Sequence, residues 1–126
     1  MSGAVTATYA GLLGLLAVLL ANNVLFVRLR AAKQPKWKPD AALRVQANFV
    51  ENVPLALVLL LLLELQGTSA SALHAFGASL LACRVLHAWG LGNYEGANYP
   101  RLIGAQGTFL LLSIMSAALV YGAFKS

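Results

Sequence analysis

Four long runs of hydrophobic residues, separated by three polar connections, make up almost the whole chain of 126 residues. About 20 apolar residues are enough for a helix to cross a bilayer, so each run is long enough to span one. The pattern therefore predicts an all-α fold, an integral membrane four-helix bundle in a single domain of residues 1–126. The predicted spans cover about residues 5–29, 42–65, 71–91 and 100–124.

The three connections carry residues that end and start helices. The segment LQGTSAS is a tight turn in which Gly67 is the predicted helix stop. The segment GLGNYEGANYP contains glycine and asparagine breakers, and Pro100 opens the run that follows. The first connection, AAKQPKWKPD, holds two prolines and three lysines. Each connection thus supports the predicted span boundaries.

The composition favours lipid as the surroundings of this surface. Hydrophobic residues make up 60% of the chain and charged residues only 10%, against about 25% charged residues in ordinary soluble domains. The charges behind the net +5 lie at the ends of the hydrophobic runs, which indicates membrane topology rather than nucleic-acid binding. The single cysteine, Cys83, excludes an intrachain disulfide, and the sequence has no metal-ligand spacing.

Basic residues predict the orientation, because cytoplasmic loops are enriched in lysine and arginine. Six basic residues surround the first connection and Arg101 lies at the third, whereas the second connection has none. The first and third connections are therefore predicted to be cytoplasmic, with both termini on the opposite side. The N-terminal run lacks the basic flank of a secretory signal, which favours a retained first helix. The six residues are Arg28, Arg30, Lys33, Lys36, Lys38 and Arg44.

The second span begins with polar residues that share one face. At 100° per residue, Arg44, Asn48 and Glu51 fall within an arc of roughly 60°. Glu51 is about ten residues into the span, roughly 15 Å deep. Charged residues at such depth are paired and face a bundle interior or a wet cavity. We therefore expect this arc to face a bundle interior or a wet cavity rather than lipid, with cations of similar depth as partners of Glu51.

Cations for this carboxylate occur in the other three spans, all in the predicted cytoplasmic half. One interpretation is a set of ion pairs that only orients the helices. The surplus of arginines favours a second interpretation, an anionic ligand, because the guanidinium fork matches carboxylates. The candidate cations are Arg28, Arg30, Arg84, His87 and Arg101.

Polar residues in the opposite half have simpler interpretations. Glu64 and His74 are expected to reach the far membrane interface, with Glu64 extending its carboxylate into water. Gly104 and Gly107 in the fourth span either allow a close helix approach or have no packing role.

Several motifs, in this order and topology, resemble the MAPEG superfamily, the membrane-associated proteins in eicosanoid and glutathione metabolism. VRLR closes the first span, and R-x-x-x-N-x-x-E-x-x-P, residues 44–54, opens the second. RVLHAWGL, residues 84–91, closes the third span, and Arg101 opens the fourth. The second-span motif is the most specific of these. The short chain with minimal loops is similar to the bacterial branch.

The resemblance implies a homotrimer in a bacterial inner membrane, with glutathione as co-substrate bound between neighbouring subunits near the cytoplasmic side. It implies that Arg28, Arg44, Asn48 and Glu51 hold the tripeptide and that Arg84 and His87 line the same site. Arg101 matches the arginine that stabilises the thiolate. The implied activity is that of a glutathione transferase, acting on a lipophilic electrophile that arrives through the bilayer, or of a glutathione-dependent peroxidase.

The sequence departs from the family pattern at one position of the third span. Many members carry a tyrosine four residues after the histidine, where this chain has Leu91. Tyr94 and Tyr99 lie nearby in the predicted loop, and Leu102 follows Arg101 where prostaglandin-forming members are often polar. A prostaglandin synthase is therefore disfavoured.

Two alternatives from other functional classes remain. The chain has the size of a small four-helix multidrug transporter, but the essential glutamate of that class lies in the first span, which here has no acid. Leu91 keeps open a non-catalytic membrane protein that retains the MAPEG fold. Turnover of a generic electrophile separates that alternative from the enzyme.

Overall fold

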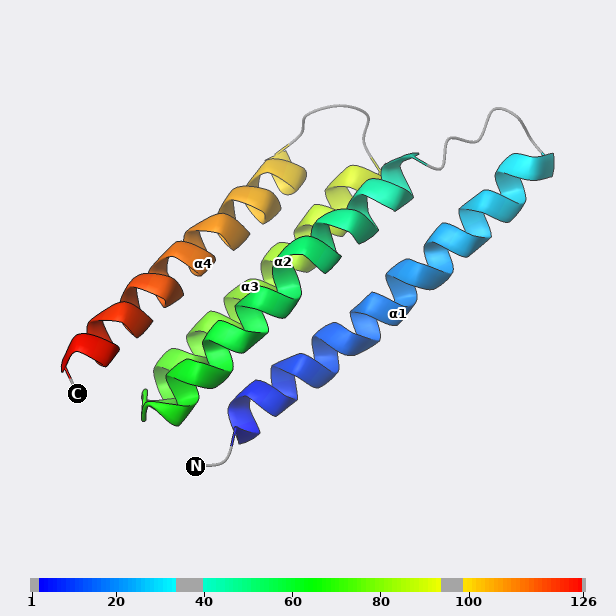
Figure 1. Cartoon of the computed structure of the whole chain (residues 1–126). Coiled ribbons are helices and arrows are strands. Elements are labelled where there is room, and N and C mark those ends of the chain that lie inside the picture. The colour runs from blue at the N-terminus through cyan, green and yellow to red at the C-terminus, as the bar shows by residue number, and fades with distance from the viewer. Residues whose placement is uncertain (1–2, 34–39, 94–98, 126) are drawn as a thin grey trace.

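The computed structural model describes residues 3–33, 40–93 and 99–125, and these residues form four α-helices (Figure 1). The all-α prediction is confirmed, and each helix contains one predicted span. The helices are α1 (Ala4–Lys33), α2 (Asp40–Leu65), α3 (Ala70–Asn93) and α4 (Tyr99–Lys125).

The four helices run antiparallel to their chain neighbours, so both ends of the chain lie at one end of the bundle (Figure 1). The helix α1 packs against α2 and α3, and α4 packs against α3 and α2, while no contact joins α1 to α4 in the described residues. The central pair, α2 and α3, therefore holds the outer helices. The last turns of α1 and α3 and the first turns of α2 and α4 lie at the other end (Figure 1).

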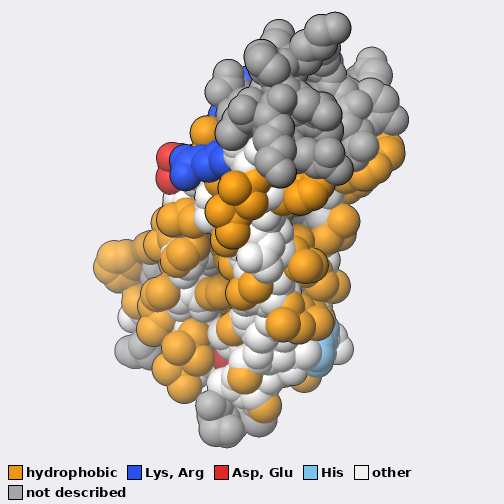
Figure 2. Space-filling view, turned by 90° about the vertical axis from the view of Figure 1, so that its right-hand side faces the viewer, with side chains coloured by type: hydrophobic (Ala, Val, Ile, Leu, Met, Phe, Trp, Pro, Cys, Tyr) orange, Lys and Arg blue, Asp and Glu red, His pale blue; other side chains and the backbone are white. Residues whose placement is uncertain are grey.

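The core follows the helical period along α2, where a buried side chain recurs every three or four residues. Hydrophobic side chains that face away from this core remain exposed, among them Leu15, Leu19 and Leu110. Figure 2 shows such side chains over most of the described surface. A surface of this kind suits a lipid environment. The buried positions of α2 are Val45, Phe49, Val53, Ala56, Leu60 and Leu63.

Three helices are long and apolar enough to cross a membrane by themselves, over Ala4–Phe26, Leu43–Leu65 and Leu102–Lys125. The helix α3 is of similar length, but His74, Arg84 and His87 make it less hydrophobic. Of these three polar residues, His74 contacts Tyr9 of α1, and Arg84 and His87 contact α4.

The turn between α2 and α3 forms where the sequence predicts it. Gly67 has a φ of 90°, which favours glycine. Its N–H donates to the Glu64 carbonyl (3.1 Å), and the Thr68 N–H donates to the Leu63 carbonyl (3.1 Å), the bond pattern of a Schellman motif. The Ser69 hydroxyl then accepts from the Ala72 N–H (3.3 Å) and caps α3.

Candidate functional site

The end of the bundle opposite the termini is built on a close approach of α3 and α4. A Cβ atom at Gly104 would lie 2.5 Å from the Cys83 carbonyl oxygen and 2.6 Å from the His87 nitrogen, so only glycine fits there. Close helix approach through small residues is common in membranes. Of the two interpretations of Gly104, the structure therefore supports the packing role.

Arg84 projects from α3 into this contact and is only 1% exposed. Its Nη1 donates to the Thr108 hydroxyl at 3.3 Å, and its guanidinium carbon lies 5.8 Å from the centre of the Phe49 ring. Within the described ranges, Nε has no hydrogen-bond partner. In the described part of the chain no ion pair joins Arg84, one of the candidate cations, to Glu51; the Phe49 ring and the Thr108 hydroxyl contact the guanidinium instead.

His87 lies one turn beyond Arg84 and is also buried, with 3% of its surface exposed. Its backbone packs directly on Gly104 of α4. Cys83, on the other side of Arg84, is half-buried, and its Sγ lies where a Cβ on Gly107 would meet it at 2.5 Å. The α3–α4 contact thus holds the inner residues of the candidate site in place.

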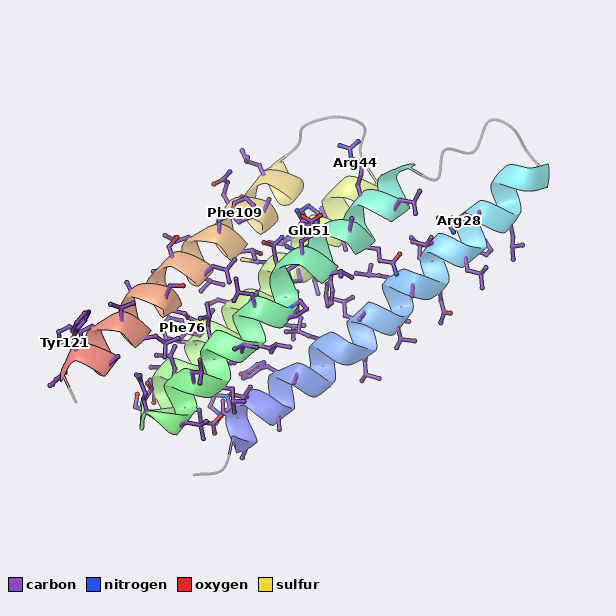
Figure 3. The ribbon with its side chains drawn as sticks, viewed as in Figure 1. Arg28, Arg44, Glu51, Phe76, Phe109 and Tyr121 are labelled. Atoms are coloured by element: carbon purple, nitrogen blue, oxygen red, sulfur yellow. The ribbon has the colours of Figure 1, made fainter. Side chains whose placement is uncertain are left out.

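The polar arc of α2 lies on the outside of the single chain. Arg44 and Glu51 are exposed and Asn48 is half-buried, whereas Val45 and Phe49 occupy the inner face. Figure 3 shows Arg44 and Glu51 along α2. Within the described residues of one chain, the arc therefore does not face the core of its own four helices. The inner face of α2 is already filled by aliphatic and aromatic side chains.

Asn52 extends the polar arc, although the sequence interpretation missed it. Its Nδ2 donates to the Asn48 carbonyl (2.8 Å) and lies 3.3 Å from Asn48 Oδ1. At 100° per residue, Asn52 lies within about 40° of Asn48, so the same helical geometry would have placed it on this face.

Arg28 is exposed on α1 and lies away from Arg44 and Glu51 (Figure 3). One chain therefore does not bring Arg28 into the polar arc of α2. Figure 2 shows the described basic and acidic side chains of this half together at one edge of the surface. Other predicted positions fall outside the described side chains or residues: Arg30, Lys33, Lys36, Lys38, Leu91, Tyr94, Tyr99 and Arg101.

At the end that holds the termini, Glu64 is buried, with 2% of its surface exposed. Its carboxylate accepts hydrogen bonds from the Val5 N–H (3.1 Å), the Thr6 N–H (2.8 Å) and the Thr6 hydroxyl (2.7 Å). A helix N-terminus favours a carboxylate because its first N–H groups lack partners. The prediction that Glu64 reaches water at the interface is wrong, since the carboxylate caps α1.

Tyr9 and His74 form a second polar contact beside this cap. The Tyr9 hydroxyl lies 2.9 Å from His74 Nδ1, and the two rings meet edge to face with centres 5.6 Å apart. Tyr9 is buried and the His74 side chain is exposed, as its expected interfacial position requires. Two cross-helix polar contacts therefore fix the start of α1 to α2 and α3.

Comparison with known proteins identifies relatives of this chain. The family model described as the MAPEG family matches residues 6–121. The inner membrane protein YecN of Escherichia coli strain K12 is 35% identical over 92 residues, which cover 68% of this chain and 69% of YecN. YecN of E. coli strain O6:H1 matches to the same extent. No solved structure matches the chain.

Proposed function

Because the chain belongs to the MAPEG family and crosses the membrane several times, we propose that it is a membrane-bound glutathione transferase, which joins the thiolate of glutathione to lipophilic electrophiles. The observation that carries the proposal is the polar arc of α2. Arg44, Asn48 and Glu51 lie outside the core of a helix whose next twelve residues are almost all apolar.

An outward-facing carboxylate at this depth is unfavourable against lipid, because ionised groups in the hydrocarbon region need partners. A neighbouring copy of the chain would cover the arc, and its exposed Arg28 would supply a cation that the same chain does not bring to Glu51. We therefore propose a homotrimer in which glutathione binds between subunits. Light scattering in mild detergent tests this assembly, and a monomeric mass contradicts it.

The charges of glutathione fit this face. The tripeptide has two carboxylates, one ammonium and one thiol. Arg28 and Arg44 suit the carboxylates because guanidinium groups form paired hydrogen bonds with them. Glu51 suits the ammonium, and the Asn48 amide adds a neutral hydrogen-bonding group. Arg84 and His87 form the buried inner wall behind these groups.

The proposed reaction needs a thiolate. A free thiol has a pKa near 8.5, so it is mostly protonated at neutral pH. A nearby guanidinium favours the anion, and we assign this role to Arg101 in the first turn of α4. The sulfur then forms a bond to the electrophilic carbon, and the leaving group departs with the bonding electrons. With a peroxide, the sulfur attacks one oxygen, the O–O bond breaks, and an alkoxide or hydroxide leaves, which gives a sulfenic acid. The thiolate of a second glutathione then attacks this sulfur, displaces hydroxide and forms the disulfide.

We propose a bacterial inner-membrane location, in line with the name of the YecN relatives, with both termini on the non-cytoplasmic side. The test uses Lys36→Cys and Thr68→Cys, each in a Cys83→Ser background. An impermeant thiol reagent added to intact cells should label position 68 and spare position 36. The reverse pattern contradicts this orientation.

Glutathione binding to the detergent-solubilised protein, measured by calorimetry, tests the proposal directly. Glu51→Gln and Arg44→Ala should each weaken binding about tenfold, since each leaves a charged group of the ligand unpaired in a poorly hydrated site. Lys125→Ala is the matched control, because Lys125 is an exposed cation at the other end of the bundle and should leave binding unchanged. No binding to the wild type at millimolar glutathione contradicts the proposal.

Arg101→Ala separates binding from chemistry. The variant should retain most of the affinity for glutathione, while the absorbance of the bound thiolate and the turnover of a test electrophile fall tenfold or more, about one pKa unit. A thiolate that titrates at the same pH in both proteins contradicts the role of Arg101. Binding without turnover in the wild type favours the non-catalytic alternative, which the leucine at position 91 keeps open.

A further inference from the structure

Among the described side chains of α4, Thr108 is the most enclosed polar one, and no sequence motif singles it out. It is 0% exposed, and its hydroxyl makes two hydrogen bonds. It accepts from Arg84 Nη1 of α3 at 3.3 Å and donates to the Gly104 carbonyl of its own helix at 2.8 Å. The hydroxyl therefore connects the buried cation to the residue at which the two helices touch.

The position of this hydroxyl matters because of the residues that share its faces. Arg101, Gly104 and Thr108 are spaced three and four residues apart, so their Cα atoms lie on one face of α4. Arg84 and His87 are three residues apart on α3. A shift of α4 along α3 would therefore move the backbone position of Arg101 relative to His87 and to the polar arc of α2.

The contacts at the two glycines are steric: the α3 backbone packs on Gly104 and the Cys83 side chain packs on Gly107. Such contacts limit how far the helices can separate but have little directional preference along the helix axis. A hydrogen bond from a buried guanidinium is directional. Among the described residues, Arg84 Nε has no partner, and the Thr108 hydroxyl is the hydrogen-bond acceptor seen for this group. Removing the hydroxyl would leave a buried cation with only the Phe49 ring beside it, and Arg84 would have to move to find an acceptor.

We propose that Thr108 is a positioning residue for the proposed glutathione chemistry: through Arg84 it sets the register of α3 against α4, and with it the place of Arg101 at the thiol. This inference rests on the proposed function for its chemical consequence. The register itself has an independent reporter, because the Cys83 thiol lies at the same contact, against Gly107.

The experiment compares Thr108→Val with Thr108→Ser and with Thr8→Val. Valine has nearly the shape of threonine but lacks the hydroxyl, and serine restores it. Thr8 is the matched control, since its hydroxyl donates to the Ala4 carbonyl within α1 (3.1 Å) and is exposed. Each protein is measured twice, by the rate at which N-ethylmaleimide labels Cys83 and by the pH titration of glutathione thiolate absorbance.

Thr108→Val should change the Cys83 labelling rate at least twofold and raise the thiolate midpoint by about half a unit or more, which corresponds to roughly a threefold loss of thiolate. The Michaelis constant for glutathione should stay within about twofold of wild type, while the turnover number falls, since thiolate formation and not binding is affected. Thr108→Ser and Thr8→Val should match the wild type in both measurements.

An unchanged rate of Cys83 labelling in Thr108→Val overturns the proposal that Thr108 sets the register of α3 against α4. Changed labelling with an unchanged thiolate midpoint also overturns the proposal, because Thr108 is then only a packing residue. If the wild type forms no bound thiolate, the glutathione function fails by itself, and the labelling rates still decide whether Thr108 sets the α3–α4 register.

Discussion

At the end of the bundle that holds the termini, the Glu64 carboxylate accepts three hydrogen bonds from α1, at 2.7 to 3.1 Å. At the opposite end, Arg84 is equally buried, and its hydrogen bond within the described residues is the 3.3 Å bond to Thr108, while Glu51 lies exposed on α2. The first charge has its partners within the chain. The charges at the second end have few within the described residues.

This difference separates a structural polar cluster from a candidate binding site. A buried charge with complete hydrogen bonding stabilises the contact that it makes, whereas a charge without such partners contributes little to folding and remains available to a ligand or another subunit. The predictions below test whether stability and ligand binding divide between the two ends in this way.

The largest loss of stability is expected for Glu64→Ala, which leaves two backbone N–H groups and one hydroxyl without their acceptor. The thermal midpoint of the detergent-solubilised protein should fall by roughly 10 °C, as measured by circular dichroism. Thr6→Val removes only the hydrogen bond from the Thr6 hydroxyl, so its thermal midpoint should fall by less than half as much as that of Glu64→Ala. An unchanged midpoint in Glu64→Ala would mean that the cap of α1 is not needed for the fold.

The next largest effect is expected at the other end and only with ligand present. Glutathione at one hundred times its dissociation constant should stabilise the wild type by about 2.7 kcal/mol, by mass action. Glu51→Gln, with its roughly tenfold weaker binding, should keep only about 1.4 kcal/mol of this gain at the same concentration. The midpoint of the unliganded variant should stay within about 2 °C of the wild type. A lower midpoint without ligand would show that Glu51 already supports the fold.

A smaller effect is expected for Tyr9→Phe, which removes the hydrogen bond to His74 and retains the buried ring. The net contribution of such a bond is about 1 kcal/mol, so the thermal midpoint should fall by about 4 °C. Glutathione affinity should be unchanged, because this contact lies at the end of the bundle away from the candidate site. A change in affinity would contradict the separation of the two ends.

The smallest effect on stability is expected for Arg84→Met, although Arg84 is as buried as Glu64. Replacing a poorly paired buried charge with an apolar side chain of similar length should change the unfolding free energy by less than about 1 kcal/mol. Arg84→Ala, which also removes volume, should be less stable than Arg84→Met. A loss in Arg84→Met as large as that of Glu64→Ala would show that Arg84 is a satisfied structural cation.

Much of the fold is determined locally and could therefore be predicted. The hydrophobic runs are each long enough for a membrane helix, and Gly67 stops α2 because the turn needs a positive φ. Helical spacing also placed Arg44, Asn48 and Glu51 on one face, and the same spacing includes Asn52. These properties depend on neighbours within a few residues of the chain.

The partners of the polar residues were not predictable in this way. The spacing of a helix shows which residues share a face but not which way the face points, so it does not predict that Glu51 lies on the outside of the single chain. Glu64 was expected in water because the start of α1, which it caps, is 58 residues away in the sequence. The role of Thr108 likewise depends on Arg84, 24 residues away on another helix.

The sequence by itself determined the four helices, their boundaries and the family, because length, hydropathy and local motifs carry that information. Only the tertiary structure decided that Glu64 is satisfied by α1, that Arg84 lies between Phe49 and Thr108, and that the arc of Arg44 and Glu51 faces outward. The physical reason is that hydrogen bonds are short and directional, so a polar partner is fixed by how helices far apart in sequence pack.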